Sequence, residues 1–574
     1  MCGILGGFLK NLKINEKKNI DYALNYLRHR GPDKRKLQFK KHNFGNYFLG
    51  HTRLSIIDLS KNGNQPMYSE DGRYGLIFNG EIINYVEIRK ELVNKGRRFY
   101  STSDTEVLLS AWEEWNENAI EKLDGMFVFG VFDFINNSLT IVKDSYGIKP
   151  LYYQNFHNGF VFASELKVLN ELNFVSRELN WKRAYDYIYH SKYDYGEETF
   201  FKNIFNLQPG HFLKINFLKQ EVIEQKQWFV PKIKKYKINY KDAVQLTRET
   251  FLKSISKNLR SDVPVGAALS GGIDSSSIVC AIKYLEPDAE INTFSYIDNK
   301  KSLSEEKWID IVNSYTKFKE NKISISNEDL MLDFDDLLNT QGEPFGGPSI
   351  FAQYKVYQLI SELDIKVCLD GQGADETIGG YNGFPGYRLQ SLMEERKIKD
   401  FIKFFNGWSR LPYNSHLDCL QRLIDTYAPE QLNFLLRKFF KTNMSSQYLN
   451  MSILKESGIN FYFDKEKKQP EYRGYRMIEF MTNSVFKYGL QSLLRHGDRS
   501  SMRFSVESRI PFLSNDFVDL MLSLPENFLV SDLGETKLIF KEAMNKIVPK
   551  EILFRKDKIG FEVDGDQILK EMRN

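Results

Sequence analysis

The spacing of apolar residues changes near residue 240, and this change constrains the fold more than any other feature of the chain. Before it, short strands alternate with turn clusters, and amphipathic helices are expected at 85–95 and 104–115. Strands joined in hairpins with a few helices outside them predict an α+β layered domain. After it, strands and helices alternate, which predicts a doubly wound parallel sheet, and from residue 389 the pattern is mostly helical.

The chain divides into two expected domains, because 574 residues are too many for a single hydrophobic core. Between residues 219 and 240 the periodicity fades and the charge rises, so we expect a solvated linker there. The first domain is then expected over 2–218 and the second over 241–574. The main expected strands are 3–8, 46–51, 75–78, 127–132, 139–143 and 159–163 in the first domain and 265–269, 291–296, 322–326 and 365–369 in the second.

The charge balance and the cysteines limit the expected partners. Lys and Arg number 79 against 75 for Asp and Glu, and the signs are interleaved, so neither nucleic acid nor a membrane is an expected partner. The four cysteines lie far apart in the sequence and do not have metal-binding spacing. We therefore expect them to be thiols in a reducing compartment. No stretch has the length of a membrane span, and no signal peptide is recognisable. We expect a cytoplasmic protein.

Cys2 follows Met1 directly and is a candidate nucleophile. If Met1 is removed, one residue carries both a thiol and a free α-amine, whose reference pKa is about 8. That amine can activate the thiol, usually through a bound water, and such single-residue catalysis suits amide hydrolysis. The alternative is that Cys2 is an ordinary residue of a buried first strand.

Several short segments of the first domain could bind an amino-acid amide. Arg53 can pair with an α-carboxylate in a forked geometry. Glu81 and Asp104 can hold an ammonium group, and Asn79-Gly80 offers a side-chain amide and a backbone N–H, the two donors that an oxyanion hole needs. Together with Cys2 these residues predict a glutamine site with a nucleophile.

A glycine-rich loop, Ser270-Gly271-Gly272-Ile273-Asp274-Ser275-Ser276, follows the strand that ends at Leu269. Its glycines allow close approach to a phosphate, and its hydroxyls and helix amides supply donors. The loop is neither a Walker loop nor a GxGxxG turn. Because Asp274 would repel pyrophosphate unless a cation lay between them, the loop implies Mg²⁺. A Gly-Ser turn that merely caps a helix is the alternative.

A second loop, from Asp370 to Tyr381, also follows an apolar strand. In a doubly wound sheet it should reach the same edge as Ser270. Asp375 could then share the Mg²⁺ with Asp274, whereas solvated loop acids are the alternative.

These motifs resemble a known family over nearly the whole chain. Five segments resemble the class II glutamine amidotransferase domain, an N-terminal nucleophile fold with an αββα sandwich: 2–4, 28–33, 53–58, 78–82 and 103–106. The Ser270–Ser276 loop resembles the pyrophosphatase-type loop of adenylating amidotransferases. Asp370–Tyr381 and Asp498–Leu513 resemble the synthetase half of glutamine-hydrolysing asparagine synthetases.

The resemblance implies a division of labour. Cys2 would attack the glutamine amide, and ammonia would pass through an internal tunnel to a carboxylate adenylated by ATP. Lys537 would stabilise the charge on phosphate, with a lone exposed Lys as the alternative. The implied glutamine-binding residues are Arg53, Leu54, Ile56, Ile57, Asn79, Gly80, Glu81 and Asp104. The implied ATP-binding residues are Leu269, Ser270, Gly271, Gly272, Asp274, Ser275, Ser276, Tyr296, Asp370, Gly371 and Asp375, with Asp274 and Asp375 on Mg²⁺.

The expected acceptor is aspartate, which gives asparagine, but three departures from the family pattern bear on this. Gln372 stands where the family commonly has Glu, and we interpret it as a specificity marker, since Gln occurs in some branches. Ser514 stands where Asp is frequent. Many relatives continue beyond Phe561, which leaves open a short tail or a truncated chain. The alternative acceptor is a sugar uronate or another carboxylate. A relative that forms a lactam would not need ammonia, and the intact Cys2, Arg53 and Asp104 disfavour this activity. Complete motifs in both halves disfavour a catalytically inactive sensor. The oligomeric state stays open, and a homodimer is one possibility.

Overall fold

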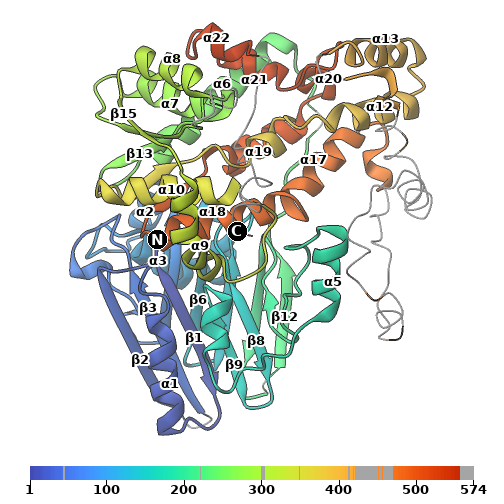
Figure 1. Ribbon diagram of the computed structural model, residues 1–574. Helices are drawn as coiled ribbons and strands as arrows, with labels where there is room; N and C mark the ends of the chain where they lie inside the picture. The colour runs from blue at the N-terminus through green and yellow to red at the C-terminus, as the bar shows by residue number, and fades with distance from the viewer. Residues whose placement is uncertain are drawn as a thin grey trace.

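The computed structural model describes residues 1–555 apart from 43–44, 220, 235, 299–303, 348, 412–413, 418, 421–423, 425–449, 451–455 and 457–468. Two parts are evident in Figure 1, a sandwich of sheets formed by the N-terminal part of the chain and a second part with a smaller sheet and many helices. The label of the N-terminus lies where the two parts meet.

The first part contains two antiparallel sheets of six strands each. One has the order β10 (Phe205–Asn206), β8 (Tyr152–Phe156), β9 (Gly159–Ala163), β1 (Gly3–Leu9), β3 (Gly45–Arg53) and β2 (Lys34–His42). The other has the order β12 (Glu221–Gln227), β11 (His211–Asn216), β7 (Ser138–Lys143), β6 (Gly125–Asp133), β5 (Tyr74–Ile82) and β4 (Met67–Tyr68).

The sheets pack face to face and are covered by helices on their outer sides. Ile4 and Phe8 of β1 share a buried cluster with Ile77 of β5 and Val128 of β6, which places apolar side chains between the sheets. The helices are α1 (Ile14–Asn25), α2 (Tyr85–Asn94), α3 (Asp104–Trp115), α4 (Leu166–Asn170) and α5 (Trp181–His190). Side chains of α1 and α4 cover one sheet, and side chains of α2 and α3 cover the other. The expected αββα sandwich is confirmed.

The stretch expected to be a linker contains a strand. Residues Glu221–Gln227 form β12, which pairs with β11 at the edge of the second sheet. All seven residues of β12 are exposed, so the strand has no buried face and lacks the apolar alternation by which a strand is recognised in sequence. The sandwich therefore extends beyond the expected boundary at residue 218.

The second part is built around a five-stranded parallel sheet, which confirms the expected fold class. Its order is β15 (Lys319–Ile323), β14 (Asn292–Tyr296), β13 (Val265–Ala268), β16 (Val367–Leu369) and β17 (Glu507–Arg509). Strand β15 begins three residues earlier than expected. The strands β13 and β16 are neighbours, so the loops that follow them leave the same edge of the sheet.

The described helices of the second part account for most of its remaining residues. They are α6 (Tyr240–Asn258), α7 (Ile273–Leu285), α8 (Glu306–Thr316), α9 (Asn327–Gln341), α10 (Ser349–Glu362), α11 (Ala374–Thr377), α12 (Phe384–Glu394), α13 (Ile398–Trp408), α17 (Arg476–Phe486), α18 (Leu490–Arg503), α19 (Asn515–Ser523), α20 (Glu526–Leu529), α21 (Leu538–Ala543) and α22 (Lys550–Leu553). None of the helices in the described ranges is both long and apolar enough to cross a membrane. Phe561 lies outside the described residues.

Candidate active sites

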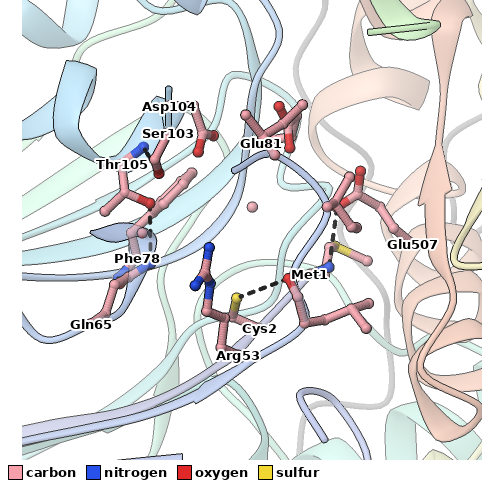
Figure 2. A pocket seen from close by; sticks show the side chains of 15 residues that line it. Met1, Cys2, Arg53, Gln65, Phe78, Glu81, Ser103, Asp104, Thr105 and Glu507 are labelled. Carbon is pink, nitrogen blue, oxygen red and sulfur yellow. Dashed lines mark hydrogen bonds and ion pairs between the residues drawn. The ribbon is translucent and has the colours of Figure 1, made fainter. Parts of the chain in front are cut away.

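A pocket surrounds Cys2 at the start of strand β1 (Figure 2). Except for Asn79, every residue expected to bind glutamine lines this pocket, although the residues come from β3, the following loop, β5 and α3. Antiparallel pairing explains this convergence, because β1 pairs with β3 and the end of β5 lies beside the first turn of α3.

The Cys2 backbone is held on both sides. Its N–H donates to Asn79 Oδ1 over 2.9 Å, and its carbonyl accepts from Arg30 Nε over 3.0 Å. The thiol sulfur lies 4.0 Å from the Leu54 carbonyl oxygen. Burial raises the pKa of the Cys2 thiol, although the nearby chain amino group, the Leu54 contact and Arg53 lower it less strongly. A buried thiol of this kind needs a base before it can attack a carbonyl.

Asn79 contacts the Cys2 backbone, and Gly80 lines the pocket that contains Cys2. Because Asn79 Oδ1 accepts from Cys2, the Asn79 amide nitrogen is left buried without a hydrogen-bond partner among the described residues. Gly80 has φ +148°, and a Cβ atom there would lie 2.1 Å from the Met126 carbonyl oxygen, so this position requires glycine. A donor that is buried and unpaired can serve a developing oxyanion.

Glu81 and Asp104 form an acidic pair in the same pocket. Asp104 Oδ2 accepts from the Ile82 N–H over 3.1 Å, and Glu81 Oε2 lies 3.6 Å from Arg509 Nη2. Burial and the neighbouring Asp104 hold the pKa of Glu81 well above its usual range, and burial raises the pKa of Asp104 to about 6. Two desolvated carboxyl groups favour a cationic ligand, since an ammonium group would stabilise their ionised forms.

Arg53 lines the pocket, but its guanidinium is bound differently from the expected fork. Nη1 donates to the Ser60 carbonyl over 2.6 Å and to Asn64 Oδ1 over 3.0 Å, and Nη2 donates to the Asp58 carbonyl. Arg53 therefore holds the loop after β3, and a bidentate bond to a carboxylate would require some of these bonds to be exchanged.

The raised pKa of Asp104 predicts a pH-dependent KM for glutamine. Because the ionised carboxylate binds the ammonium group, the KM should rise about tenfold per unit as the pH falls below about 6. Asp104→Asn should weaken this dependence, which Glu81 alone would then carry, and raise the KM at pH 8 by about 10²-fold, since only one carboxyl group is left to bind the cation. Steady-state glutaminase assays from pH 5 to 8 measure both effects.

Glu106→Gln is the matched control for Asp104→Asn. Glu106 lies in the same turn of α3, but its carboxylate accepts from the backbone of Tyr100 and Ser101, outside the set of residues that line the pocket. An equal change of KM in both variants would contradict the assignment of Asp104.

The predicted nucleotide loop lies between β13 and α7. Ser275 Oγ accepts from the Ser270 N–H over 3.1 Å, and the Ser275 and Ser270 hydroxyls are 3.1 Å apart. Gly271 has φ +70°, and a Cβ atom there would lie 2.7 Å from Trp308 Cβ. A Cβ atom on Gly371 would lie 3.3 Å from the Ser275 nitrogen, so the loops after β13 and β16 are in contact, as the strand order requires.

Lys537 joins the acidic residues of these two loops. Its Nζ lies 2.6 and 2.7 Å from the two carboxylate oxygens of Asp274 and 2.6 Å from Asp375 Oδ1. Lys537 is buried, so the alternative that it is a lone exposed lysine is excluded. Burial alone would lower the Lys537 pKa, but the two carboxylates raise it above its ordinary value. Asp274 and Asp375 therefore already converge on a cation.

This donor set fits Mg²⁺ bound together with phosphate. Mg²⁺ is usually held by one or two carboxylates plus phosphate oxygens and water, rather than by an all-protein cage. The described part of the chain contains no cluster of three or more His, Cys, Asp or Glu suited to a metal.

The remaining expected nucleotide residues lie along the same edge. Asp370 accepts from the Tyr357 hydroxyl over 2.9 Å, and Tyr296, which ends β14, donates to Asp298 over 3.2 Å. Leu269 and Ser276 are buried. Gln372 is partly exposed, and its N–H donates to Asp370 Oδ1 over 3.3 Å. Ser514 stands at the N-cap position of α19, a position that Asp and Ser both favour.

Arg30 connects the Cys2 pocket to the second domain, a role that the sequence did not predict. Its guanidinium forms a bidentate pair with Asp498 of α18 at 2.8 and 3.0 Å and also contacts Glu165 at 2.9 Å. Arg30 was part of a recognised motif, but its partner lies 468 positions away, so nothing in the local spacing indicates the pair. Glu507, which lines the pocket from β17, was missed for the same reason.

Comparisons with known proteins agree with this arrangement. Residues 1–229 match the family described as glutamine amidotransferase domain, and residues 246–574 match asparagine synthase. The chain is 29% identical to glutamine-hydrolyzing asparagine synthetase 1 of Bacillus subtilis (strain 168), covering 100% of this chain and 89% of that protein. It is 30% identical to asparagine synthetase 3 of the same organism, covering 97% and 86%. Amidase chry2 of Gibberella zeae is 24% identical, with 93% and 83% covered. The chain thus belongs to the asparagine synthase family of ATP-dependent ligases that carry a glutamine amidotransferase domain.

Proposed function

We propose that the protein is a glutamine-dependent asparagine synthetase that binds glutamine, ATP and aspartate. It would hydrolyse glutamine, adenylate the aspartate side chain and amidate it, releasing AMP and pyrophosphate. The observation that carries the proposal is the pocket around Cys2, where two acidic groups match the ammonium end of glutamine and the unpaired Asn79 amide lies next to the Cys2 backbone.

In the first reaction the Cys2 thiolate would attack the amide carbon of glutamine. Once Met1 is removed, the Cys2 α-amine takes the thiol proton, and the Asn79 amide and the Gly80 N–H stabilise the tetrahedral oxyanion. Collapse of this intermediate releases ammonia and leaves a thioester, which water hydrolyses to glutamate.

In the second reaction an aspartate carboxylate oxygen would attack the α-phosphorus of ATP, and pyrophosphate would leave. The Ser270–Ser276 loop and the start of α7 would offer hydroxyls and amides to the phosphates. Asp274 and Asp375 would hold Mg²⁺, which when bound supplies charge neutralisation on the pyrophosphate. The Lys537 ammonium is close enough to both acids to stabilise charge on the same phosphates. Ammonia then displaces AMP from the acyl group.

A buried cluster of apolar residues that reaches both sites supports ammonia transfer between them. Met1, Leu54 and Met126 beside the first pocket belong to the same buried cluster as Leu369 and Ala374 beside the nucleotide loops. Apolar walls suit the passage of neutral ammonia, because they disfavour its protonation to ammonium.

A second acceptor remains a candidate because Gln372 is neutral. It lies at the edge where the proposed nucleotide site is found, and a neutral amide would tolerate a larger carboxylate such as a nucleotide-linked sugar uronate.

An acceptor screen tests the proposal. We expect aspartate to stimulate glutamine-dependent release of AMP and pyrophosphate, and Gln372→Glu to keep or raise that turnover. For a uronate acceptor the added charge should instead lower turnover. Strong turnover with a uronate and none with aspartate would overturn the asparagine assignment, and release of ADP and phosphate would overturn adenylation.

A further inference from the structure

Glu507 reaches the glutamine pocket from the second domain. It is fully buried on β17, and Figure 2 shows its carboxylate turned toward Met1. Glu507 Oε1 accepts from Arg509 Nε over 2.7 Å. Oε2 lies 3.2 Å from the Met1 amino nitrogen, but outside hydrogen-bond geometry, so the described residues offer this oxygen an ion pair and no aligned donor. One oxygen is therefore fixed, and the other faces the start of the chain.

Removal of Met1 would leave this oxygen facing the new α-amine. The Met1 and Cys2 nitrogens are one residue apart, hence separated by at most about 3.6 Å. A water at the position of the Met1 nitrogen would have the Cys2 amine and Glu507 Oε2 as partners. The Cys2 nitrogen itself is fixed by Asn79 Oδ1 at 2.9 Å, so the amine has a defined place.

We propose that Glu507 is a positioning residue of the glutaminase reaction, which holds the Cys2 α-amine directly or through one water. This inference rests on the proposed function. When the thiol proton moves from Sγ to the amine, a thiolate and an ammonium form, and the Glu507 carboxylate stabilises the ammonium without taking a proton. The relation is that of the carboxylate to the imidazole in a catalytic triad.

The charge state of Glu507 suits this role. Burial alone would raise its pKa, but the chain amino group, Arg509 and Lys149 lower the pKa to about 2. Glu81 and Asp104, by contrast, have raised pKa values and face the ammonium end of glutamine. The titratable and charged groups that face Cys2 or Glu507 from the neighbouring elements are Arg30, His51, Arg53, Glu81, Asp104, Lys149 and Arg509.

This role would make the glutaminase base depend on domain docking. Glu507 belongs to the synthetase domain, and β17 pairs with β16. The Asp370 N–H at the end of β16 donates to the Arg509 carbonyl over 2.8 Å. A single short strand therefore contacts both the Cys2 pocket and the loop proposed to bind ATP.

The test compares Glu507→Gln with wild type in the full chain, after mass spectrometry has verified removal of Met1. The pH profile of kcat/KM for glutamine hydrolysis is measured without ATP. We expect the acidic limb to move about one unit to lower pH, because loss of a nearby negative charge lowers the pKa of the amine. The plateau should fall about tenfold, since the weaker base forms less thiolate.

Two further variants separate this role from a structural one. Glu507→Asp keeps the negative charge, so the acidic limb of its pH profile should stay at the wild-type pH. This should hold even if the shorter side chain lowers the rate. Glu87→Gln breaks another ion pair between the domains, with Arg260 at 2.7 Å on the protein surface, and should leave the profile unchanged. An acidic limb at the wild-type pH in processed Glu507→Gln, or a limb shifted equally in Glu507→Asp, would overturn the inference. Absence of glutamine hydrolysis in wild type would instead refute the proposed function.

Discussion

Cys2→Ala is expected to lower the kcat of glutamine hydrolysis by at least about 10⁴-fold, because it removes the attacking atom itself. The two hydroxyl groups that line the pocket both take part in hydrogen bonds within the protein. Ser103 Oγ accepts from the Thr105 N–H at the start of α3, and Thr105 Oγ1 accepts from Gln65. Synthesis from added ammonium should survive, because Asp274 and Lys537 belong to the other domain. Parallel assays of glutamate formation and of ammonium-dependent pyrophosphate release measure both activities.

Cys280→Ala is the control for this variant, since Cys280 is buried in α7 and distant in sequence from the pocket residues. It should retain glutaminase activity. Glutamine hydrolysis by Cys2→Ala at a rate near that of wild type would show that the N-terminal nucleophile is wrongly assigned. Protein that keeps Met1 should be as inactive as Cys2→Ala, because its Cys2 nitrogen is an amide and cannot act as a base.

Asp274→Ala is expected to lower AMP and pyrophosphate formation by about 10³-fold while leaving glutamine hydrolysis largely intact. Asp274 is one of the two carboxylates that contact Lys537, so its loss removes one of the two negative charges that would hold a cation against pyrophosphate. Pyrophosphate release with saturating ammonium isolates this half-reaction from glutamine hydrolysis.

Asp310→Ala is the control for Asp274→Ala. Asp310 lies on α8, where it pairs with Lys322 near the surface, and its loss should leave adenylation unchanged. Equal loss of pyrophosphate release in both variants would argue for a general loss of structure. Wild-type adenylation by Asp274→Ala would contradict the cation site.

Much of the fold could be predicted because its signals are local. The apolar runs of β1, β6 and β9 and the strand-to-loop transition after Leu269 are readable within a few residues. The position of β12 could not be predicted, because an exposed edge strand carries no apolar alternation.

The candidate sites were predictable in their residue types but not in their contacts. Cys2, Asn79 and Asp104 meet as expected, whereas Arg53 is bound by its own loop. The contributions of Arg30 and Glu507 depend on the docking of two domains, which no local pattern encodes. The residue types of each half can be read from the sequence, whereas the contacts between the halves become visible only in three dimensions.

Transfer of the amide nitrogen is the central claim, and isotope tracing tests it most directly. The protein is incubated with amide-¹⁵N glutamine, ATP, Mg²⁺ and aspartate in the presence of excess unlabelled ammonium, and the asparagine formed is analysed by mass spectrometry. We predict asparagine that carries mostly ¹⁵N in its side chain, with AMP formed in equal amount. Recovery of the ¹⁵N only as free ammonium, with no labelled amide on any acceptor carboxylate, would contradict the account.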